Sequence, residues 1–108
     1  MHLMTQEIER QLRTAPQDQE PNVTPVVVKY FTPWAGATWW VTEGEKQEDG
    51  DWRLFGFADL GDAQCAELGY TLLRDIESLR GPGGLRVERD LHLPPTTLAD
   101  VLREYGRL

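Results

Sequence analysis

The hydrophobic positions of this chain repeat with two periods, one typical of strands and one typical of helices. β-Branched and aromatic residues are concentrated in three stretches, 25–31, 38–42 and 52–59, which predict strands. The pair Asp49-Gly50 lies between the last two stretches and is typical of a tight hairpin turn. The pattern therefore predicts an antiparallel meander of three strands.

A fourth strand is predicted over 85–93, where hydrophobic and polar positions alternate and Arg89 is the one charged residue on the hydrophobic side. An unpaired charge on that side would be costly. We therefore expect Arg89 to be at least half buried and ion-paired, and we assign its neighbours Glu88 and Asp90 to the same structural ion-pair group. Candidate carboxylates for the guanidinium are Glu43, Glu77 and Asp59.

Helical spacing occurs near both ends of the chain. Ile8 and Leu12 lie four positions apart after Thr5, whose side chain suits a helix N-cap. A last helix is predicted after Thr97, with Asp100 in the position that completes a capping box. The buried stripe of this last helix is predicted to be Leu98, Val101, Leu102 and Tyr105.

A middle helix is predicted over 71–80. Leu72, Ile76 and Leu79 recur at helical spacing, Thr71 is the predicted cap, and the glycine-rich run that follows ends the helix. The preceding segment, 61–70, is predicted to be a loop or a single helical turn.

Together these elements predict an α+β fold in the order α-β-β-β-α-β-α, with a small antiparallel sheet packed with about three short helices. A length of 108 residues predicts a single domain, 1–108. The polar, proline-bounded segment 15–24 is predicted to be a linker-like connection between the first helix and the sheet.

Aromatic residues fall on both faces of the predicted meander. With a two-residue turn at Asp49-Gly50, Trp39 lies on one face and Trp40 on the other. Trp39 is predicted to be part of the core. The second face is either covered by helices or by the N-terminal arm, or it forms an exposed aromatic patch.

A partner-binding surface is predicted from the segment that carries these tryptophans. Trp34 lies in a predicted loop, where a ring has less core to fill, and tryptophan is enriched at binding hot spots. We predict that Trp34, with Trp40 as its neighbour, forms the contact surface and that Glu43 and Glu45 lie at its rim. Packing of Trp34 against nearby prolines is the alternative.

The net charge of -7 narrows the classes of partner. An acidic surface repels phosphate backbones, so direct nucleic-acid binding is not expected, and a basic or nucleic-acid-handling protein is the expected partner. Cys65 is the only cysteine, which excludes an intramolecular disulfide and a cysteine-based zinc site. The acidic N-terminus lacks a signal-peptide pattern and no apolar run approaches membrane-spanning length, so we expect a cytoplasmic protein and no membrane partner.

A group of carboxylates is the candidate metal-binding site of the chain. Glu43, Glu45, Asp59, Glu88 and Asp90 would converge if the second and fourth predicted strands were neighbours, and oxygen ligands suit Mg²⁺ or Mn²⁺. In the alternative, which we favour, the glutamates solvate a hairpin end and the other acids pair with arginines. No catalytic motif is present, and no cofactor is expected.

Four runs of the sequence, LMTQEIERQL, VVKYFTPWAGATWWVTEGE, FGFADL and ELGYTLLRDIESLRGPGGLRVERDLHL, resemble the bacterial family called domain of unknown function 2958. The resemblance covers nearly the whole chain. It implies no activity and no catalytic residues. It implies an association with plasmids, phages and other mobile genetic elements.

We interpret the protein as a non-enzymatic, protein-binding accessory module that acts through an acidic and aromatic surface. One alternative is an anti-defence inhibitor that mimics the charge of DNA. A further alternative is a divalent-metal-dependent enzyme that uses the carboxylate cluster. A single-strand nucleic-acid binder would require basic residues beside the tryptophans, where the sequence places acids.

Overall fold

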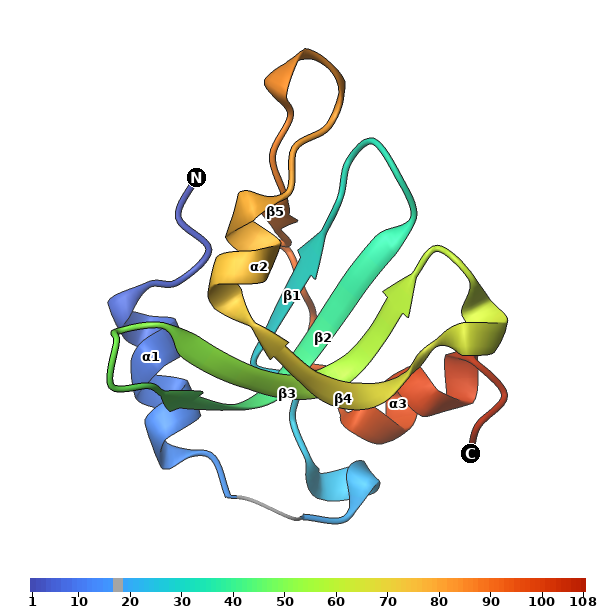
Figure 1. Cartoon of the computed structure of the whole chain (residues 1–108). Coiled ribbons are helices and arrows are strands. Elements are labelled where there is room, and N and C mark those ends of the chain that lie inside the picture. Colours follow the sequence, from blue (N-terminus) through green and yellow to red (C-terminus); the bar gives the residue numbers. More distant parts are fainter. Residues whose placement is uncertain (17–18) are drawn as a thin grey trace.

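The computed structural model of the chain describes residues 1–16 and 19–108 and has an α+β architecture (Figure 1). One antiparallel sheet has the strand order β4-β3-β2-β1-β5. The helices and strands are α1 (Gln6–Thr14), β1 (Val28–Phe31), β2 (Ala37–Lys46), β3 (Trp52–Leu60), β4 (Glu67–Leu72), α2 (Leu73–Ser78), β5 (Glu88–Arg89) and α3 (Leu98–Glu104). The 3-10 helices are η1 (Pro21–Val23), η2 (Ala63–Cys65) and η3 (Pro82–Gly84). The predicted fold class is confirmed, with one strand, β4, more than predicted.

The connection between α1 and the sheet is only partly described. Within the predicted linker-like segment, 15–24, η1 forms one short turn, and residues 17–18 lie outside the described part of the chain. Within the described residues, none of the helices combines the length and the apolar character that crossing a bilayer requires.

The terminal helices begin where the sequence predicts. The Thr5 hydroxyl accepts a hydrogen bond from the backbone N–H of Ile8 at 3.1 Å. Thr97 and Asp100 form the predicted capping box, in which each side chain accepts from the other residue's backbone N–H. Each cap satisfies a backbone N–H group that has no partner inside its helix.

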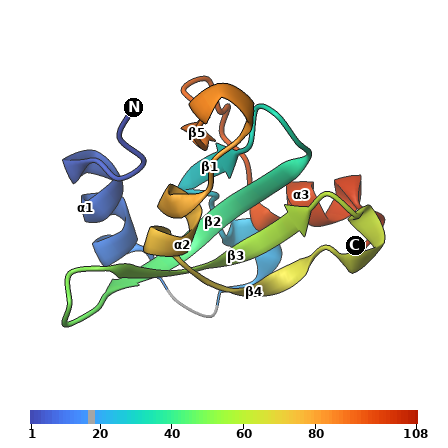
Figure 2. The ribbon, with the colours of Figure 1, turned by 45° about the horizontal axis from the view of Figure 1, so that its top comes forward.

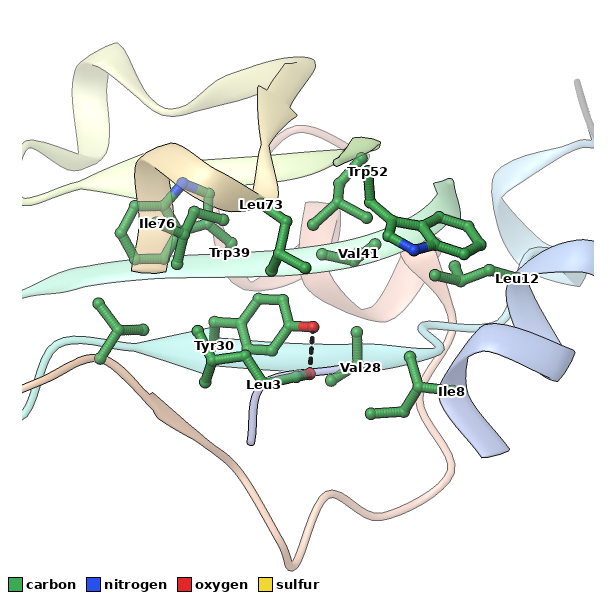
Figure 3. Close-up of a cluster of buried hydrophobic side chains, with 12 residues drawn as sticks. Leu3, Ile8, Leu12, Val28, Tyr30, Trp39, Val41, Trp52, Leu73 and Ile76 are labelled. Atoms are coloured by element: carbon green, nitrogen blue, oxygen red, sulfur yellow. Dashed lines mark hydrogen bonds between the residues drawn. The ribbon is translucent and has the colours of Figure 1, made fainter. Parts of the chain in front are cut away.

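The larger core lies between the sheet and the pair α1 and α2 (Figures 1 and 3). Trp39 is buried here, as predicted, beside Tyr30, which is fully buried. The Tyr30 hydroxyl donates to the Leu3 carbonyl at 2.6 Å, and this bond holds the N-terminal arm against the sheet. Ile8 and Leu12 of α1 are both buried in this core.

α3 lies on the opposite face of the sheet from α1 and α2 (Figure 2), and a second, smaller core lies between α3 and that face. Trp40 is 7% exposed and packs with Phe57, Leu98 and Val101. The Trp40 and Tyr105 rings meet edge to face, with centroids 5.7 Å apart. A helix therefore covers the part of the second face that holds Trp40.

Residues 67–72 form a strand where a loop and a helix start were predicted. Thr71, the predicted helix cap, lies in β4, and α2 begins at Leu73. Leu73 and Ile76 are the buried residues of α2, whereas Leu79 is exposed, so the predicted stripe is wrong in two of its three members. The reason is that Leu72 completes an alternating pattern that pairs with β3 before the helix starts.

The last strand, β5, is much shorter than the predicted 85–93. Only Glu88 and Arg89 pair with β1. Val87 is buried, but Leu85 and Leu91 are exposed, because the chain leaves the sheet on both sides of this short pairing. Alternation in the sequence therefore overstated the extent of the strand.

Candidate functional site

The β2–β3 hairpin has a longer turn than predicted. Lys46 pairs with Trp52, so the turn spans 47–51, and the predicted two-residue turn is wrong. The Asp49 carboxylate accepts a hydrogen bond from the backbone N–H of Asp51 at 3.0 Å, which stabilises the wider turn.

A β-bulge at Thr42 places the acids of β2 on the α3 face of the sheet. The register shifts between Val41 and Glu43, so Thr42 is the extra residue. Thr42 is buried, and its hydroxyl donates to the Phe55 carbonyl at 3.3 Å. Without the extra residue Glu43 would follow Val41 onto the face with the larger core. With it, Glu43 pairs with Phe55 and shares the face of Trp40.

Beyond the edge of α3, this face of the sheet exposes aromatic and aliphatic side chains. Cross-strand pairs join Phe55 to Tyr70 and Arg53 to Leu72, and the next pair joins Leu68 to Phe57, which already lies under α3. Tyr70 is 66% exposed, although aromatic side chains of this size are usually buried. We call this surface the Tyr70 patch; it consists of Glu43, Glu45, Arg53, Phe55, Leu68, Tyr70 and Leu72.

The central ring of the Tyr70 patch is held by its neighbours. The Phe55 and Tyr70 centroids are 5.0 Å apart at an interplanar angle of 58°. The Arg53 guanidinium carbon lies 4.7 Å from the Tyr70 centroid, and the same guanidinium is 3.3 Å from the Glu45 carboxylate. An ordered ring loses less side-chain entropy when a partner covers it.

A small depression on the Tyr70 patch has an acidic wall. Glu43, Glu45, Arg53, Phe55 and Tyr70 line it together with Gly44. Glu43 forms no ion pair with a described residue; it is partly exposed and lines the depression together with Arg53. The arrangement offers one exposed ring, aliphatic surface around it and a negative rim, which suits a partner that presents a basic and apolar surface.

The structure does not bring the predicted contact residues together. Trp34 lies in the β1–β2 loop and packs on Gly81, close enough that a Cβ at position 81 would lie 2.2 Å from the Trp34 ring. Trp40 is buried under α3 on the opposite face of the sheet from the core against which Trp34 packs. Only Glu43 and Glu45 of the predicted surface lie in the Tyr70 patch, and exposed Tyr70 occupies the place expected for a tryptophan.

The carboxylates proposed as a metal site are also dispersed. β1 separates β2 from β5, so Glu43 does not approach Glu88 or Asp90. Asp59 accepts a hydrogen bond from the Tyr105 hydroxyl at 2.5 Å and another from the Gly61 backbone N–H. No group of three or more histidine, cysteine or carboxylate side chains in the described part of the chain is arranged to hold a metal ion.

The predicted ion pair of Arg89 is replaced by a different contact. The Arg89 Nε donates to the backbone carbonyl of His2 at 3.2 Å, and no carboxylate of the described residues lies within ion-pair distance of the guanidinium. Asp90 instead lies 3.9 Å from the Lys29 ammonium on β1. Arg89 is mostly buried, as predicted, because the N-terminal arm crosses over it.

A second, broader depression lies at the C-terminal end of α3. Trp40, Asp59, Tyr105 and Arg107 line it, with Glu104 at its rim. Burial, and then the hydrogen bond to Asp59, raise the pKa of Tyr105 to about 12. The Arg107 guanidinium donates to the Ala63 carbonyl at 3.2 Å. The polar groups here bond mainly to one another, which favours a structural role that fixes the C-terminus.

Cys65 lacks the surroundings of a nucleophile. Its thiol donates to the Asp62 carboxylate at 3.4 Å, and this bond and the negative charge raise the pKa of the Cys65 thiol. The reactive thiolate is therefore disfavoured at neutral pH.

Phe55 and the exposed side chains of β4 are the site residues that sequence reasoning missed. A signal was present: Leu68, Tyr70 and Leu72 alternate with Gly69 and Thr71 and thus have the period of a strand. The helical spacing that starts at Leu72 overlaps this pattern, and the overlap led to the wrong assignment.

A family model described as "Protein of unknown function (DUF2958)" matches residues 3–105. No curated protein and no solved structure matches the chain.

Proposed function

The chain belongs to the DUF2958 family, and we propose that it is a non-enzymatic, protein-binding accessory module whose contact surface is the Tyr70 patch. The observation that carries the proposal is Tyr70 itself, a ring 66% exposed between Arg53 and Phe55. Aromatic rings of this kind are the usual anchors of protein interfaces. The mobile-element setting that the resemblance implies, a plasmid or a phage, belongs to the same proposal.

The charge of the chain supports a basic partner. The net charge is -7, and Glu43 and Glu45 flank the exposed ring. Negative charge at the rim attracts a basic protein during encounter, while the desolvated ring and its aliphatic neighbours supply the affinity. A nucleic-acid-handling protein is a natural member of this partner class, because its binding surface is basic.

The proposal is tested by capture from a bacterial lysate with three immobilised proteins: wild type, Tyr70→Ser and Leu60→Ser. Leu60 is the matched control because it is 71% exposed and lies on the other face of the sheet. We expect a basic protein, identified by mass spectrometry, to be captured by wild type and by Leu60→Ser but not by Tyr70→Ser. Equal capture by all three proteins would refute the Tyr70 patch as the contact surface.

A further inference from the structure

The two edges of the sheet differ in how well they are protected against pairing with another strand. The β5 edge has only two residues, Glu88 and Arg89, and both are charged. Short, charged edge strands discourage further pairing. The β4 edge runs over six residues, Glu67–Leu72, and pairs with β3 without a bulge. It contains no proline and no basic residue, and Glu67 at its start is its only charge. β4 therefore lacks the usual protection of an edge strand.

The outer backbone groups of β4 are unused among the described residues. The strand's backbone hydrogen bonds go to β3, and none is made between residues 67–72 and any other described segment. In an antiparallel ladder every second residue directs its N–H and C=O groups away from the neighbouring strand. These groups form a row along the outer side of β4, which is an edge strand of the sheet (Figure 1).

The exposed side chains of β4 continue the Tyr70 patch to this edge. Leu68, Tyr70 and Leu72 are 42%, 66% and 37% exposed and point to the same side of the sheet. An added strand would bring every second side chain beside these three, because neighbouring strands share their faces. Backbone pairing and side-chain contact would then be made by one extended segment.

We propose that β4 binds an extended, basic segment of the partner by strand addition. This inference rests on the proposed function and specifies how the Tyr70 patch contacts the partner. Hydrophobic side chains of the segment lie beside Leu68, Tyr70 and Leu72 on the same face of the sheet, and basic residues alternate with them. The net charge of -7 selects a basic segment and disfavours a second copy of the chain, which would bring an equal negative charge to the same edge.

The test uses a synthetic peptide of about eight residues, the length of an ordinary strand, in which valine and lysine alternate. Two further peptides carry N-methyl groups, one on every valine and the other on every lysine. In an added strand all residues of one type direct their N–H groups at β4 and all residues of the other type direct them away. We expect the unmodified peptide and one methylated peptide to bind, and the other methylated peptide to fail.

Amide hydrogen exchange, followed by NMR on the full chain, provides the structural readout. We expect the unmodified peptide to slow exchange at alternating amides of Glu67–Leu72 by at least about tenfold, because each outward N–H gains an acceptor. Tyr70→Ser should lower the affinity for the unmodified peptide. At saturating peptide the same alternating amides of β4 should still be protected.

Three results would overturn strand addition. The first is evidence that the Tyr70 patch binds the peptide through side chains alone. Such evidence would be either peptide binding without slower exchange in β4 or equal binding of both methylated peptides, and the proposed function would then stand. The second is no binding of the unmodified peptide. The third is protection of β4 without peptide together with a doubled mass in solution, which would make a second copy the occupant. Failure of the proposed function is detected separately, in the capture experiment, if Tyr70→Ser captures the same protein as wild type in equal amount.

Discussion

Replacing Gly81 with alanine tests the most unexpected contact of the fold, the packing of Trp34 on the loop after α2. A Cβ at position 81 would lie 2.2 Å from the Trp34 Cδ2 and 2.6 Å from two further atoms of the same ring. The backbone at Gly81 has φ -105° and ψ -173°, which any residue adopts. The cost of Gly81→Ala is therefore steric and comes from displacing Trp34.

The expected cost of Gly81→Ala is about 1–3 kcal/mol, the usual range for overpacking. Trp34→Ala removes a partly buried ring, so we expect about 2–4 kcal/mol, slightly below the cost for a fully buried tryptophan. In the double variant the added methyl group fills space that the ring has left. The double variant should cost about as much as Trp34→Ala alone.

Urea denaturation of the four proteins in this cycle measures the coupling. Gly69→Ala is the control, because a Cβ there meets no heavy atom within 4 Å, and we expect it to stay within about 0.5 kcal/mol of wild type. Thermal melts should agree, with Gly81→Ala about 4–8 °C lower for each kcal/mol lost. Additive effects of Gly81→Ala and Trp34→Ala, within about 0.5 kcal/mol, would refute the contact.

Three further predictions concern the cores and their polar groups. Tyr30→Phe should lower the free energy of unfolding by about 1–2 kcal/mol in urea, because the buried Leu3 carbonyl loses its donor; an unchanged midpoint would contradict this. The pKa of Tyr105 is raised to about 12 from the ordinary tyrosine value of about 10. The neutral hydroxyl therefore stabilises the fold fully at pH values below about 10, and this contribution is lost as the pH rises from about 10 to 12. Tyr105→Phe should thus flatten the fall of melting temperature over that range, and an equal slope in both proteins would refute the assignment. A chelator should leave the melting temperature unchanged, because a core of this size folds without a metal; a fall of many degrees would favour the metal-enzyme alternative.

Features set by neighbouring residues were predicted from the sequence. The Thr5 cap and the Thr97–Asp100 capping box depend on side chains that lie within one turn of the backbone groups they satisfy. The inward orientation of Trp39 followed from the period of a strand, which the structure keeps as far as Val41. Local chemistry fixed these features, so no distant contact was needed to infer them.

Features set by distant contacts were missed. No local signal marks Thr42 as a bulge, because the shift appears only in its pairing with β3. Trp34 is packed because the loop that contains Gly81 folds back over it, far along the chain. Trp40 is covered because α3, near the C-terminus, crosses its face of the sheet, one of the alternatives that the sequence left open. The structure therefore places an exposed ring beside acids, as the sequence predicts, but the exposed ring is Tyr70, whereas Trp40 is buried and Trp34 is partly buried.

The affinity of the purified partner for wild type and for Tyr70→Ser tests the central claim most directly. Calorimetry should show binding at least about tenfold weaker for Tyr70→Ser, the loss expected when a hot-spot ring is removed, and unchanged for Leu60→Ser. Melts of the three proteins confirm that each is folded, since Tyr70 is mostly exposed and contributes little to stability. Equal affinities for wild type and a folded Tyr70→Ser would contradict the assignment of the Tyr70 patch as the binding surface.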